Sequence, residues 1–600
     1  MSRRHAGLAT LFAVLTLLAI ASLVLLAASR QLVLIHANAQ NQHRYHQALD
    51  NAEEGLRQGS QALANGQPLP ADNDRFSLAQ QAVPPDRMRL RSTGNYDGHR
   101  VTVQRDFLQS GNQSGSSSAL TLVGNLDLSG AINLIGDKPV EMTVDGTVTL
   151  SGSVDGIATL QSTGDIIVTG SQTINTLYAN GNIELGNGRY QTVKALGNLT
   201  LRGDAAIGAL ARVNGKAAFL SSPGVAQAVA RAEVKGDVDI AMGGARFGQL
   251  DAEGKVDIRQ IGALDALRAE GHLSVQGWGA PIAATVAGAA SYNAGNPDIR
   301  IAFQPGLKLN LQPVPPLEVK RPRLDAYDYR GQAHYVFTHA ADGGVRVTVR
   351  KIHGLADGEY RLGRDPDNRR PNYLCRAADA NGVCRAPATL ICKGHSPQND
   401  CFAGSRPGQW KLDGVTFAPG VLWFDGDLEV GNGTYHNTFI ANGSIATSGQ
   451  HVSYAVNYAG AVGICANADF PSLYPEDDCR GGTFKGRPVG NAVLLAGGYV
   501  DKRFHGGDIT LGSSSRVFGN VWAGNQLFSS GSTTIHGYVS ALAQAGGQGA
   551  RPHQWGASTT IDLRGLPDSF RPDGPPDNGG GGGQSGGGRF KALPYSWMDT

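Results

Sequence analysis

The stretch GNLTLRG, residues Gly197–Gly203, returns along the chain with the same alternation of apolar and polar residues. Leu199 and Leu201 alternate with polar residues, so both leucines fall on one face of a short strand. Successive copies start 16 to 22 residues apart, and a near-constant period of this kind indicates a repeat architecture. The other copies begin at Gly124, Gly146, Gly164, Gly181, Gly215, Gly236, Gly254 and Gly271.

Each strand of this pattern is too short to be stable alone, but stacked copies bury their aliphatic residues in one continuous core. The pattern therefore predicts a mainly β fold built around a β-helix or β-solenoid. Gly, Asn and Asp at the coil corners tolerate the left-handed or tight backbone angles expected there. Further copies begin at Gly426, Gly443, Gly507 and Gly524, so we expect two solenoid parts, 119–292 and 420–548.

The material between the two solenoid parts has a different composition. A Pro-rich stretch opens it, and we predict an inserted, Cys-containing subdomain over 314–419 and a second excursion over 461–482. The short loops favour sequential disulfides within the even set of cysteines, although six cysteines allow many pairings. No C-x-x-C spacing supports a zinc site instead. The candidate pairs are Cys375 with Cys384, Cys392 with Cys401, and Cys465 with Cys479.

The flanking segments are less regular. Residues 67–108 are predicted to form a small β region followed by a flexible Ser- and Gly-rich linker, and residues 549–600 a Gly/Pro-rich tail. Near its end, Pro594, Tyr595 and Trp597 offer groups that would dock onto a surface, against the alternative of a free terminus.

The first thirty residues indicate the compartment. Residues 8–29 carry no charge and are long enough to cross a bilayer as a helix, and Arg3 and Arg4 before them favour a cytoplasmic N-terminus. A cleaved secretory signal and a plain membrane anchor are the competing interpretations. The helical pattern continues without Pro or Gly until Gly55, so we expect an exported continuation over 30–66.

This N-terminal region resembles type IV pilin-like proteins, specifically PilX-type pilus assembly proteins. The matching features are the short basic leader 1–7, the apolar run after it, Asn51–Leu56 on the emerging helix, and Arg89–Gln104, which is similar to the Ser-Thr-Gly-x-Tyr strand pair of that family. The resemblance covers roughly the first hundred residues. It implies that a prepilin peptidase cuts between Gly7 and Leu8.

The resemblance also implies an assembly role for the apolar helix. Major pilins have Glu five residues after the cut, where this chain has Phe12, and this difference favours an accessory subunit. Packing against other pilin-like subunits in the inner membrane would use the apolar residues Leu11, Phe12, Leu15 and Leu18. The bulk of the chain would then be periplasmic or displayed on a pilus of a Gram-negative cell.

Signals for chemistry are weak. The sequence PEDDC, which includes Asp477 and Asp478, is similar to an element of polygalacturonases, and Phe504–Asp508 loosely resembles another, but His436–Phe439 has Phe where that family carries its acid. Asp365–Asn368 offers oxygen ligands without the glycine and distal Glu of an EF-hand loop. We therefore predict no catalytic residue, no metal and no cofactor.

The charge balance excludes a broad class of partner. Lys plus Arg number 52 and Asp plus Glu 50, so the net charge is +2, and we expect no nucleic-acid partner. The predicted function is a non-enzymatic minor pilin-like component that presents a β-solenoid for adhesion or assembly, with a host surface or glycan as a possible ligand. The alternatives are a membrane-anchored envelope adhesin or scaffold unrelated to pili, and a β-helix polysaccharide-degrading enzyme.

Overall fold

The computed structural model describes residues 14, 17–18, 22, 40–41, 44–62, 69–83, 87–109, 120–571 and 590–592, except 226, 277–279, 320, 482, 547–550 and 557. The chain forms two compact units, described separately here: an N-terminal unit of Met1–Gly115 with Gly580–Thr600, and a solenoid unit of Ser116–Gly579. Because the N-terminal unit takes chain from both ends, the solenoid unit is an insertion in it.

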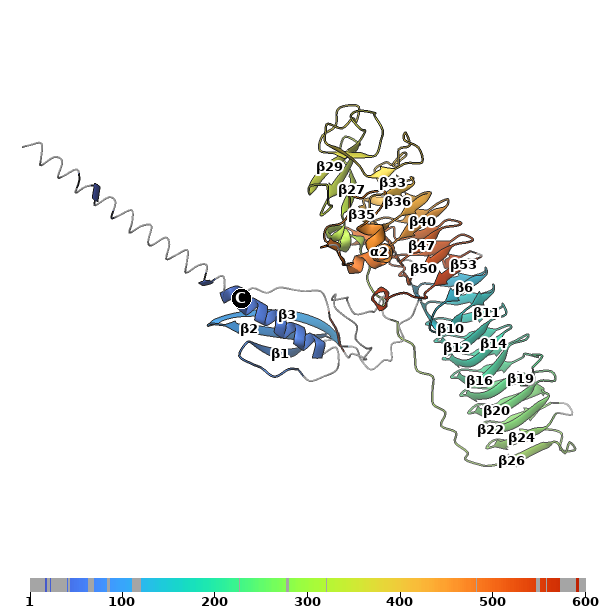
Figure 1. Ribbon diagram of the computed structural model, residues 1–600. Coiled ribbons are helices and arrows are strands. Elements are labelled where there is room, and N and C mark those ends of the chain that lie inside the picture. Colours follow the sequence, from blue (N-terminus) through green and yellow to red (C-terminus); the bar gives the residue numbers. More distant parts are fainter. Residues whose placement is uncertain are drawn as a thin grey trace, which may run out of the picture. The chain divides into compact units, whose positions relative to one another are not determined.

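The N-terminal unit packs one helix on an antiparallel sheet (Figure 1). The helix is described over 44–62, and its buried Ala52 and Leu56 contact Leu90 and Val103 of the sheet. The strand order is β1-β2-β3-β54, with bounds β1 (Phe76–Val83), β2 (Arg87–Tyr96), β3 (His99–Gln109) and β54 (Phe590–Ala592).

The surroundings of Gly94 explain why the Ser-Thr-Gly-x-Tyr stretch has a glycine at this position. A Cβ at Gly94 would lie 2.0 Å from the carbonyl oxygen of Ala48 and 2.4 Å from the amide nitrogen of Ala52, both in the backbone of the helix. Any side chain there would therefore push the helix off the sheet. The predicted membrane segment 8–29 lies outside the described residues apart from Val14, Leu17, Leu18 and Ser22, all helical.

The solenoid unit confirms the predicted β-solenoid. One face is a 16-stranded parallel sheet that contains every rung resembling GNLTLRG. In spatial order its strands are β25 (Ala290–Ser291), β23 (Leu273–Val275), β21 (Val256–Gln260), β19 (Val238–Ala241), β17 (Ala217–Phe219), β15 (Leu199–Leu201), β13 (Ile183–Leu185), β11 (Ile166–Val168), β8 (Val148–Leu150), β5 (Leu126–Leu128), β52 (His553–Trp555), β49 (Leu527–Ser529), β46 (Ile509–Leu511), β39 (Ile445–Thr447), β36 (Gly426–Val430) and β33 (Gly408–Leu412).

A second parallel face lies across the core, and a shorter 7-stranded sheet forms a third side. The second face runs β26 (Ile299–Phe303), β24 (Ile282–Val286), β22 (Ala263–Ala269), β20 (Arg246–Ala252), β18 (Val229–Val234), β16 (Ala206–Val213), β14 (Arg189–Ala195), β12 (Thr173–Ala179), β10 (Ile157–Ser162), β7 (Val140–Asp145), β4 (Leu120–Val123), β51 (Val539–Ala541), β48 (Asn520–Ala523), β43 (Ala492–Ala496), β38 (Asn437–Ala441) and β35 (Gly420–Phe424). The third sheet comprises β37 (Gly433–Tyr435), β40 (His451–Tyr454), β47 (Arg516–Phe518), β50 (Thr534–His536), β53 (Thr559–Asp562), β6 (Ile132–Ile135) and β9 (Val154–Asp155).

The two predicted solenoid parts are one stack, and the chain begins it in the middle. Strand β4 pairs with β7, the strand of the same face in the next coil, and also with β51, more than four hundred residues away in sequence. Strands β5 and β52, and β6 and β53, meet in the same way. Figure 1 shows the red strands lying directly beside the cyan ones. We call the coils from β4 to β26 the regular half and those from β33 to β53 the aromatic half.

The repeated stretch can now be read residue by residue. Leu199 and Leu201 are fully buried, and Gly203 has φ 55°, so this glycine turns a left-handed corner as expected. Gly197 does not have a positive φ, and here the sequence interpretation needs correction. A Cβ at Gly197 would lie 2.7 Å from the carbonyl oxygen of Gly181 in the coil before, so it is close stacking that requires glycine.

The residue after the stacked glycine connects successive coils. The side chain of Asn182 accepts the backbone N–H of Asn198 at 2.9 Å, and that of Asn198 accepts the N–H of Lys216 at 2.8 Å. Asn125, Asp165 and Asp237 make the same bond to the coil that follows each. Where a copy has Asn or Asp at this position, as in these five cases, its side chain satisfies a corner donor that the sheet leaves unpaired.

An extended strap returns the chain from β26 to the opposite end of the stack (Figure 1). Residues 304–324 run along the corners of the regular half, where Asn214 both accepts from and donates to the backbone of Val314, and Asn180 does the same with Leu317. The strap advances three residues for two coils. Three residues of polyproline-II helix span about 9.3 Å and two strand spacings about 9.6 Å, so a Pro-rich segment matches the stack.

Beyond the strap, the chain caps the aromatic end. The 3₁₀ helix η1 (Ala326–Gln332) leads into an antiparallel meander of β27 (Tyr335–His339), β28 (Val345–Val349), β29 (Gly358–Gly363), β30 (Tyr373–Cys375) and β31 (Ala388–Leu390). Strand β27 also pairs with β35, so the predicted subdomain 314–419 is the strap, this cap and the first coil strand β33. Small hairpin-like pairs complete it and the later excursions: β32 (Cys392–Lys393) with β34 (Thr416–Phe417), β41 (Cys479–Arg480) with β42 (Thr483–Phe484), and β44 (Gly498–Val500) with β45 (Arg503–His505).

Three disulfides join the cysteines in the sequential order expected from the short loops, Cys375–Cys384, Cys392–Cys401 and Cys465–Cys479. The last one closes an excursion that contains helix α2 (Val456–Ile464) and precedes η2 (Pro488–Asn491). Residues 549–600, predicted as a tail, contain coil strands β52 and β53, the 3₁₀ helix η3 (Asp568–Phe570) and β54 of the N-terminal unit.

Candidate functional site

Five ionisable side chains gather where the cap meets the solenoid. His334 lies just before β27 and Lys351 just after β28, while Asp477 and Asp478 come from the disulfide-closed excursion and Arg487 lies just before η2. The side chains of His334 and Asp478 are 1% exposed and that of Asp477 is 6% exposed. Segments far apart in sequence therefore bring their charges into one buried cluster, which we call the cap cluster.

The cap cluster is fully paired. Asp477 Oδ1 lies 3.0 Å from His334 Nε2, and its Oδ2 lies 3.2 Å from Lys351 Nζ and 3.3 Å from Arg487 Nη1. Asp478 Oδ1 accepts from Arg487 Nε at 2.8 Å. Two carboxylates are thus balanced by two cations, as buried charges require.

The donor set of the cap cluster does not fit a resident metal ion. The backbone N–H of Val421 donates to His334 Nδ1 at 2.9 Å, so the proton of the neutral imidazole is on Nε2, facing Asp477. A metal-bound histidine shows the reverse arrangement, because it gives a lone pair to the metal and donates from its other nitrogen. The guanidinium of Arg487, whose Nη2 is 2.6 Å from His334 Nε2, is the cation of this site.

Burial sets the protonation of the cluster. Burial lowers the pKa of His334, and this effect outweighs its hydrogen bond to Asp477. Burial alone would raise the pKa of Asp477, but the hydrogen bond from His334 and the charge of Arg487 hold that pKa well below its usual range. Asp477 is therefore ionised and His334 neutral at pH 7.

The other residues of the polygalacturonase comparison have separate structural roles. Asp508 accepts hydrogen bonds from Asn525 and from the backbone of Gln526, in the same corner position as Asn182 and Asn198. Among the described residues no hydrogen bond or ion pair joins Asp508 to Asp477 or Asp478.

The stretch Asp365–Asn368, which offered oxygen ligands in the sequence, forms a polar turn. Asp365 accepts a hydrogen bond from the N–H of Asp367, and Asn368 accepts one from the N–H of Arg370.

An aromatic column follows the third side of the aromatic half. His436, Tyr454, Phe518 and His536 occupy matching positions on successive coils, and the Tyr454 ring stacks on that of Phe518 at 4.6 Å and on that of His436 at 5.4 Å. The faces of the Tyr454 ring are therefore covered by His436 and Phe518, whereas a sugar platform needs an open ring face. Trp410 and Trp423 are buried.

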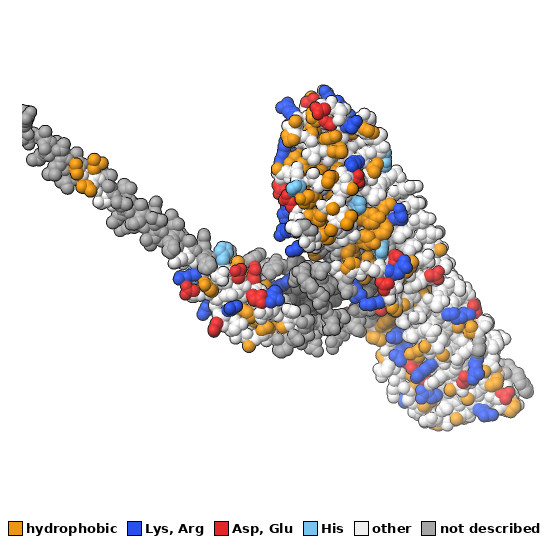
Figure 2. All heavy atoms as spheres, viewed as in Figure 1, with side chains coloured by type: hydrophobic (Ala, Val, Ile, Leu, Met, Phe, Trp, Pro, Cys, Tyr) orange, Lys and Arg blue, Asp and Glu red, His pale blue; other side chains and the backbone are white. Residues whose placement is uncertain are grey.

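Helix α2 lies over this column and carries no charged residue. Its Tyr458 donates to or accepts from His536 at 2.8 Å, while Val462 is 80% exposed. Hydrophobic side chains gather on the surface in the region of α2, where the sequence predicted only a disulfide-closed excursion (Figure 2). Helix α2 therefore lies in an apolar part of the surface of the solenoid unit.

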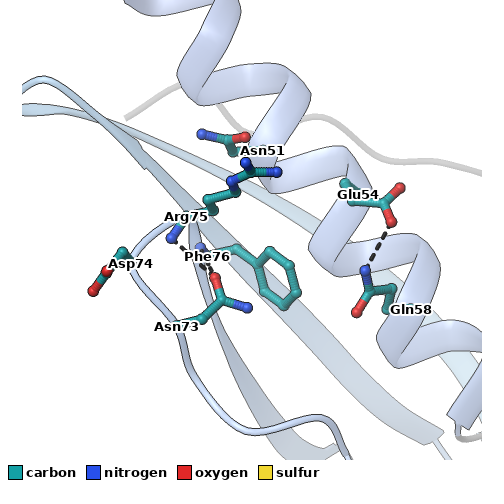
Figure 3. A pocket seen from close by; sticks show the side chains of 7 residues that line it. All are labelled: Asn51, Glu54, Gln58, Asn73, Asp74, Arg75 and Phe76. Atoms are coloured by element: carbon teal, nitrogen blue, oxygen red, sulfur yellow. Dashed lines mark hydrogen bonds between the residues drawn. The ribbon is translucent and has the colours of Figure 1, made fainter.

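The N-terminal unit has an open polar depression between its helix and the segment that leads into β1 (Figure 3). Asn73 Oδ1 accepts the N–H groups of Arg75 and Phe76, and hydrogen bonds from Arg57 and Gln58 lower the pKa of Glu54 to about 2. Asn73 and Glu54 thus already have hydrogen-bond partners within the N-terminal unit.

The predicted assembly residues fall mostly beyond what is described. Gly7, Leu8, Leu11, Phe12 and Leu15 lie outside the described residues. Leu18 is helical and 58% exposed. Among the helices of the described residues, none has both the length and the apolar character of a membrane span.

Comparisons with known proteins add little. No family model matches the sequence, and no curated protein matches it. Among solved structures, the competence-associated pilin ComZ from Thermus thermophilus aligns with 14% identity and a TM-score of 0.22, over 92% of this chain and 97% of that chain. At this TM-score the likeness carries no argument about fold or function.

Sequence reasoning missed the side chains that hold the strap. Each lies at the position just before the stacked glycine of a coil. Polar residues at these positions were a signal in the sequence, because a corner that holds no other segment does not require them. Asp145, Asn180, Asn214, Lys235, Glu253 and Glu270 hold the strap in this way.

Proposed function

We propose that this chain is a non-enzymatic, minor pilin-like subunit whose small N-terminal unit carries a β-solenoid as an inserted display module. The observation that carries the proposal is the order of the sheet in the N-terminal unit, where β3 and β54 are paired neighbours although the solenoid unit separates them in sequence. The chain therefore enters the solenoid unit from the helix-on-sheet unit and returns to the same unit after it.

Two further features support the pilin-like part. Gly94, in the stretch that resembles the family, is the residue that allows the helix to lie against the sheet. Before this helix in the sequence, residues 8–29 have the length and apolarity of a membrane span. In this proposal the helix anchors the chain in the inner membrane and packs against other pilin-like subunits, and the solenoid is periplasmic or displayed on a pilus.

The absence of catalysis is part of the proposal. It is supported by the pairing of Asp477 and Asp478 with Arg487 and Lys351, which leaves their charges neutralised and buried. Adhesion to a host surface or glycan, or contact with an assembly partner, would instead use outer surfaces of the solenoid, which are long and rigid in such folds.

The test is the mature N-terminus of the full chain in a cell that has a prepilin peptidase. We expect Leu8 at the N-terminus of the membrane-bound protein and loss of processing in the Gly7→Leu variant. An intact Met1 in the unsubstituted chain would favour the membrane-anchored adhesin or scaffold. Cleavage of a pectin-like glycan that is lost in Asp477→Asn would favour the enzyme and overturn the non-enzymatic role.

A further inference from the structure

The two ends of the solenoid stack are finished differently. At the aromatic end, β27 of the cap pairs with the outer edge of β35, and its Phe337 is fully buried. At the regular end the last strand of the second face is β26, and no strand within the described part of the chain pairs with its outer edge. We propose that β26 of a second copy of this chain pairs antiparallel with this edge, so that two solenoid units join end to end.

A column of core side chains is left uncovered at the regular end. Successive coils place Ala252, Ala269, Val286 and Phe303 at matching positions of the second face. The first three are fully buried, whereas Phe303 is 57% exposed. The terminal repeat of a soluble solenoid usually presents a polar outer side. An aromatic core residue in this place therefore favours a further apolar strand as its cover.

Backbone hydrogen bonds show which residues of β26 face the open edge. The N–H of Ile282 in β24 donates to the carbonyl of Asp298 at 3.0 Å, and the N–H of Gln304 donates to the carbonyl of Val286 at 2.8 Å. Residues that bond to one neighbouring strand alternate along a parallel strand with residues that face the other side. Even-numbered residues of β26 therefore bond to β24, and the N–H and C=O groups of Ile301 point to the open edge.

A two-fold arrangement centred on Ile301 uses these groups. Ile301 then faces its own equivalent in the second copy as a hydrogen-bonded pair, and Phe303 faces Ile299. These three residues continue the core-facing row of the neighbouring coil, because Ile299 lies beside the buried Ile282 and Phe303 beside the buried Val286. Every pair on this row is therefore apolar, and the exposed ring of Phe303 gains a cover.

Charge favours the same register. Arg300 and Ala302 are exposed on the outward-facing row of β26. In the two-fold arrangement Arg300 lies opposite Ala302 of the second copy, whereas a shift by two residues would place Arg300 opposite Arg300, and like charges directly opposite are unfavourable. Strand β26 is thus complementary to itself, which points to a second copy as the occupant. This inference does not depend on the proposed pilin-like function.

Cysteine cross-linking of the full chain tests the interface and its register. Arg300→Cys in one copy and Ala302→Cys in the other would form a non-hydrogen-bonded pair with Cα atoms about 4.5 Å apart, close enough for a disulfide. Each position would lie about 7–8 Å from its own equivalent, which is too far. No native cysteine is free, so each variant has one reactive thiol.

We expect a mixture of the two singly substituted chains, after mild oxidation, to give about tenfold more disulfide-linked dimer than either variant alone, as measured by mass spectrometry of peptides. Equal yields in the three samples would overturn the register. Absence of the linked dimer from all three would overturn the interface with a second copy.

Charge substitution on the outward-facing row gives a second measurement, by analytical ultracentrifugation of the full chain in detergent. Ala302→Lys should raise the dissociation constant of the dimer about fivefold, because the introduced lysine faces Arg300 of the second copy, and adding Arg300→Asp should reverse the effect. The matched control is Ala266→Lys, at an exposed position of β22 two coils away. Equal dissociation constants for Ala302→Lys and the control would overturn the proposal, as would failure of Arg300→Asp to reverse the effect.

Discussion

The regular half and the aromatic half of the solenoid share one stack but are built from different side chains. In the regular half, aliphatic residues make up most of the core beside Phe219 and Phe247, a glycine and often an Asn or Asp recur at the corner, and an external strap covers one edge. In the aromatic half, Phe417, Phe424 and Phe439 fill the core, and two buried histidines, His451 and His553, satisfy the backbone around them.

The difference shows that coil geometry does not require a strict repeat. The aromatic half tolerates an excursion of some fifty residues between β40 and β46 because neighbouring coils still pair in register, as Ile445 does with Ile509. A disulfide and the cap cluster fix the excursion. The described coils of the regular half contain no disulfide, although Asp251 there is buried and paired with Arg268. They stack closely at their corner glycines, so the two halves should respond differently to substitution and to acid.

The largest expected effect is in the cap cluster of the aromatic half. Arg487→Met would leave Asp477 and Asp478 buried without their main cation, which should cost about 4 kcal/mol of unfolding free energy. Urea unfolding followed by circular dichroism measures this. A triple variant with Asp477→Asn and Asp478→Asn added should recover most of the loss. If Arg487→Met is as stable as the parent protein, the cluster is not the staple described here.

The second effect belongs to the regular half. A Cβ at Gly254 would lie 2.4 Å from the carbonyl oxygen of Gly236, a backbone atom that is fixed by stacking on both sides. Gly254→Ala should therefore cost about 3 kcal/mol in urea unfolding. The control is Gly244→Ala, because a Cβ there meets nothing within 4 Å. Equal stability of the two variants would contradict the stacking argument.

The third expected effect is a difference between the two halves in the stability that is lost at low pH. Burial lowers the pKa of His451 to about 4, so the folded protein keeps it neutral while the unfolded chain binds a proton below about pH 6.5. The resulting stability is present above pH 6.5 and falls as pH decreases, by about 2.5 kcal/mol at pH 4.5. Hydrogen exchange at pH 7 and 4.5 should show a loss of protection around 431–453 that His451→Asn removes.

The matched control for the pH experiment is His272→Asn in the regular half, where the histidine side chain is exposed and accepts the N–H of Ala289. This substitution should leave the pH dependence unchanged. Equal loss of protection in both halves at pH 4.5 would show that buried histidines do not set the difference.

The smallest expected effect is at the strap. Asn214→Ala removes one donor and one acceptor bond to the backbone of Val314, which should cost about 1 kcal/mol and raise hydrogen exchange over 311–317. Thr200→Ala, at an outward position of the same stretch of coils, should leave that exchange unchanged. An unaltered strap in Asn214→Ala would mean that Pro-rich geometry alone holds it.

The candidate site shows where sequence reasoning reached its limit. Asp477 and Asp478 stood out by their resemblance to a catalytic element, but His334 and Lys351 lie more than a hundred residues from them in sequence, and only the folded structure shows the charges to be paired. The sequential disulfides were predictable because each joins cysteines only 9 or 14 residues apart. A disulfide across a short loop can be inferred from residues that are close in the sequence, whereas the cap cluster depends on contacts between distant segments.

By itself, the sequence determined the coil: alternation in GNLTLRG decides which side chains are buried, because a strand places successive side chains on opposite faces. Only the tertiary structure decided the order of the coils, the path of the strap and the return of β54 to β3. The physical reason is that open strand edges offer the same backbone groups in every coil, so which edges meet depends on what the rest of the chain has already covered.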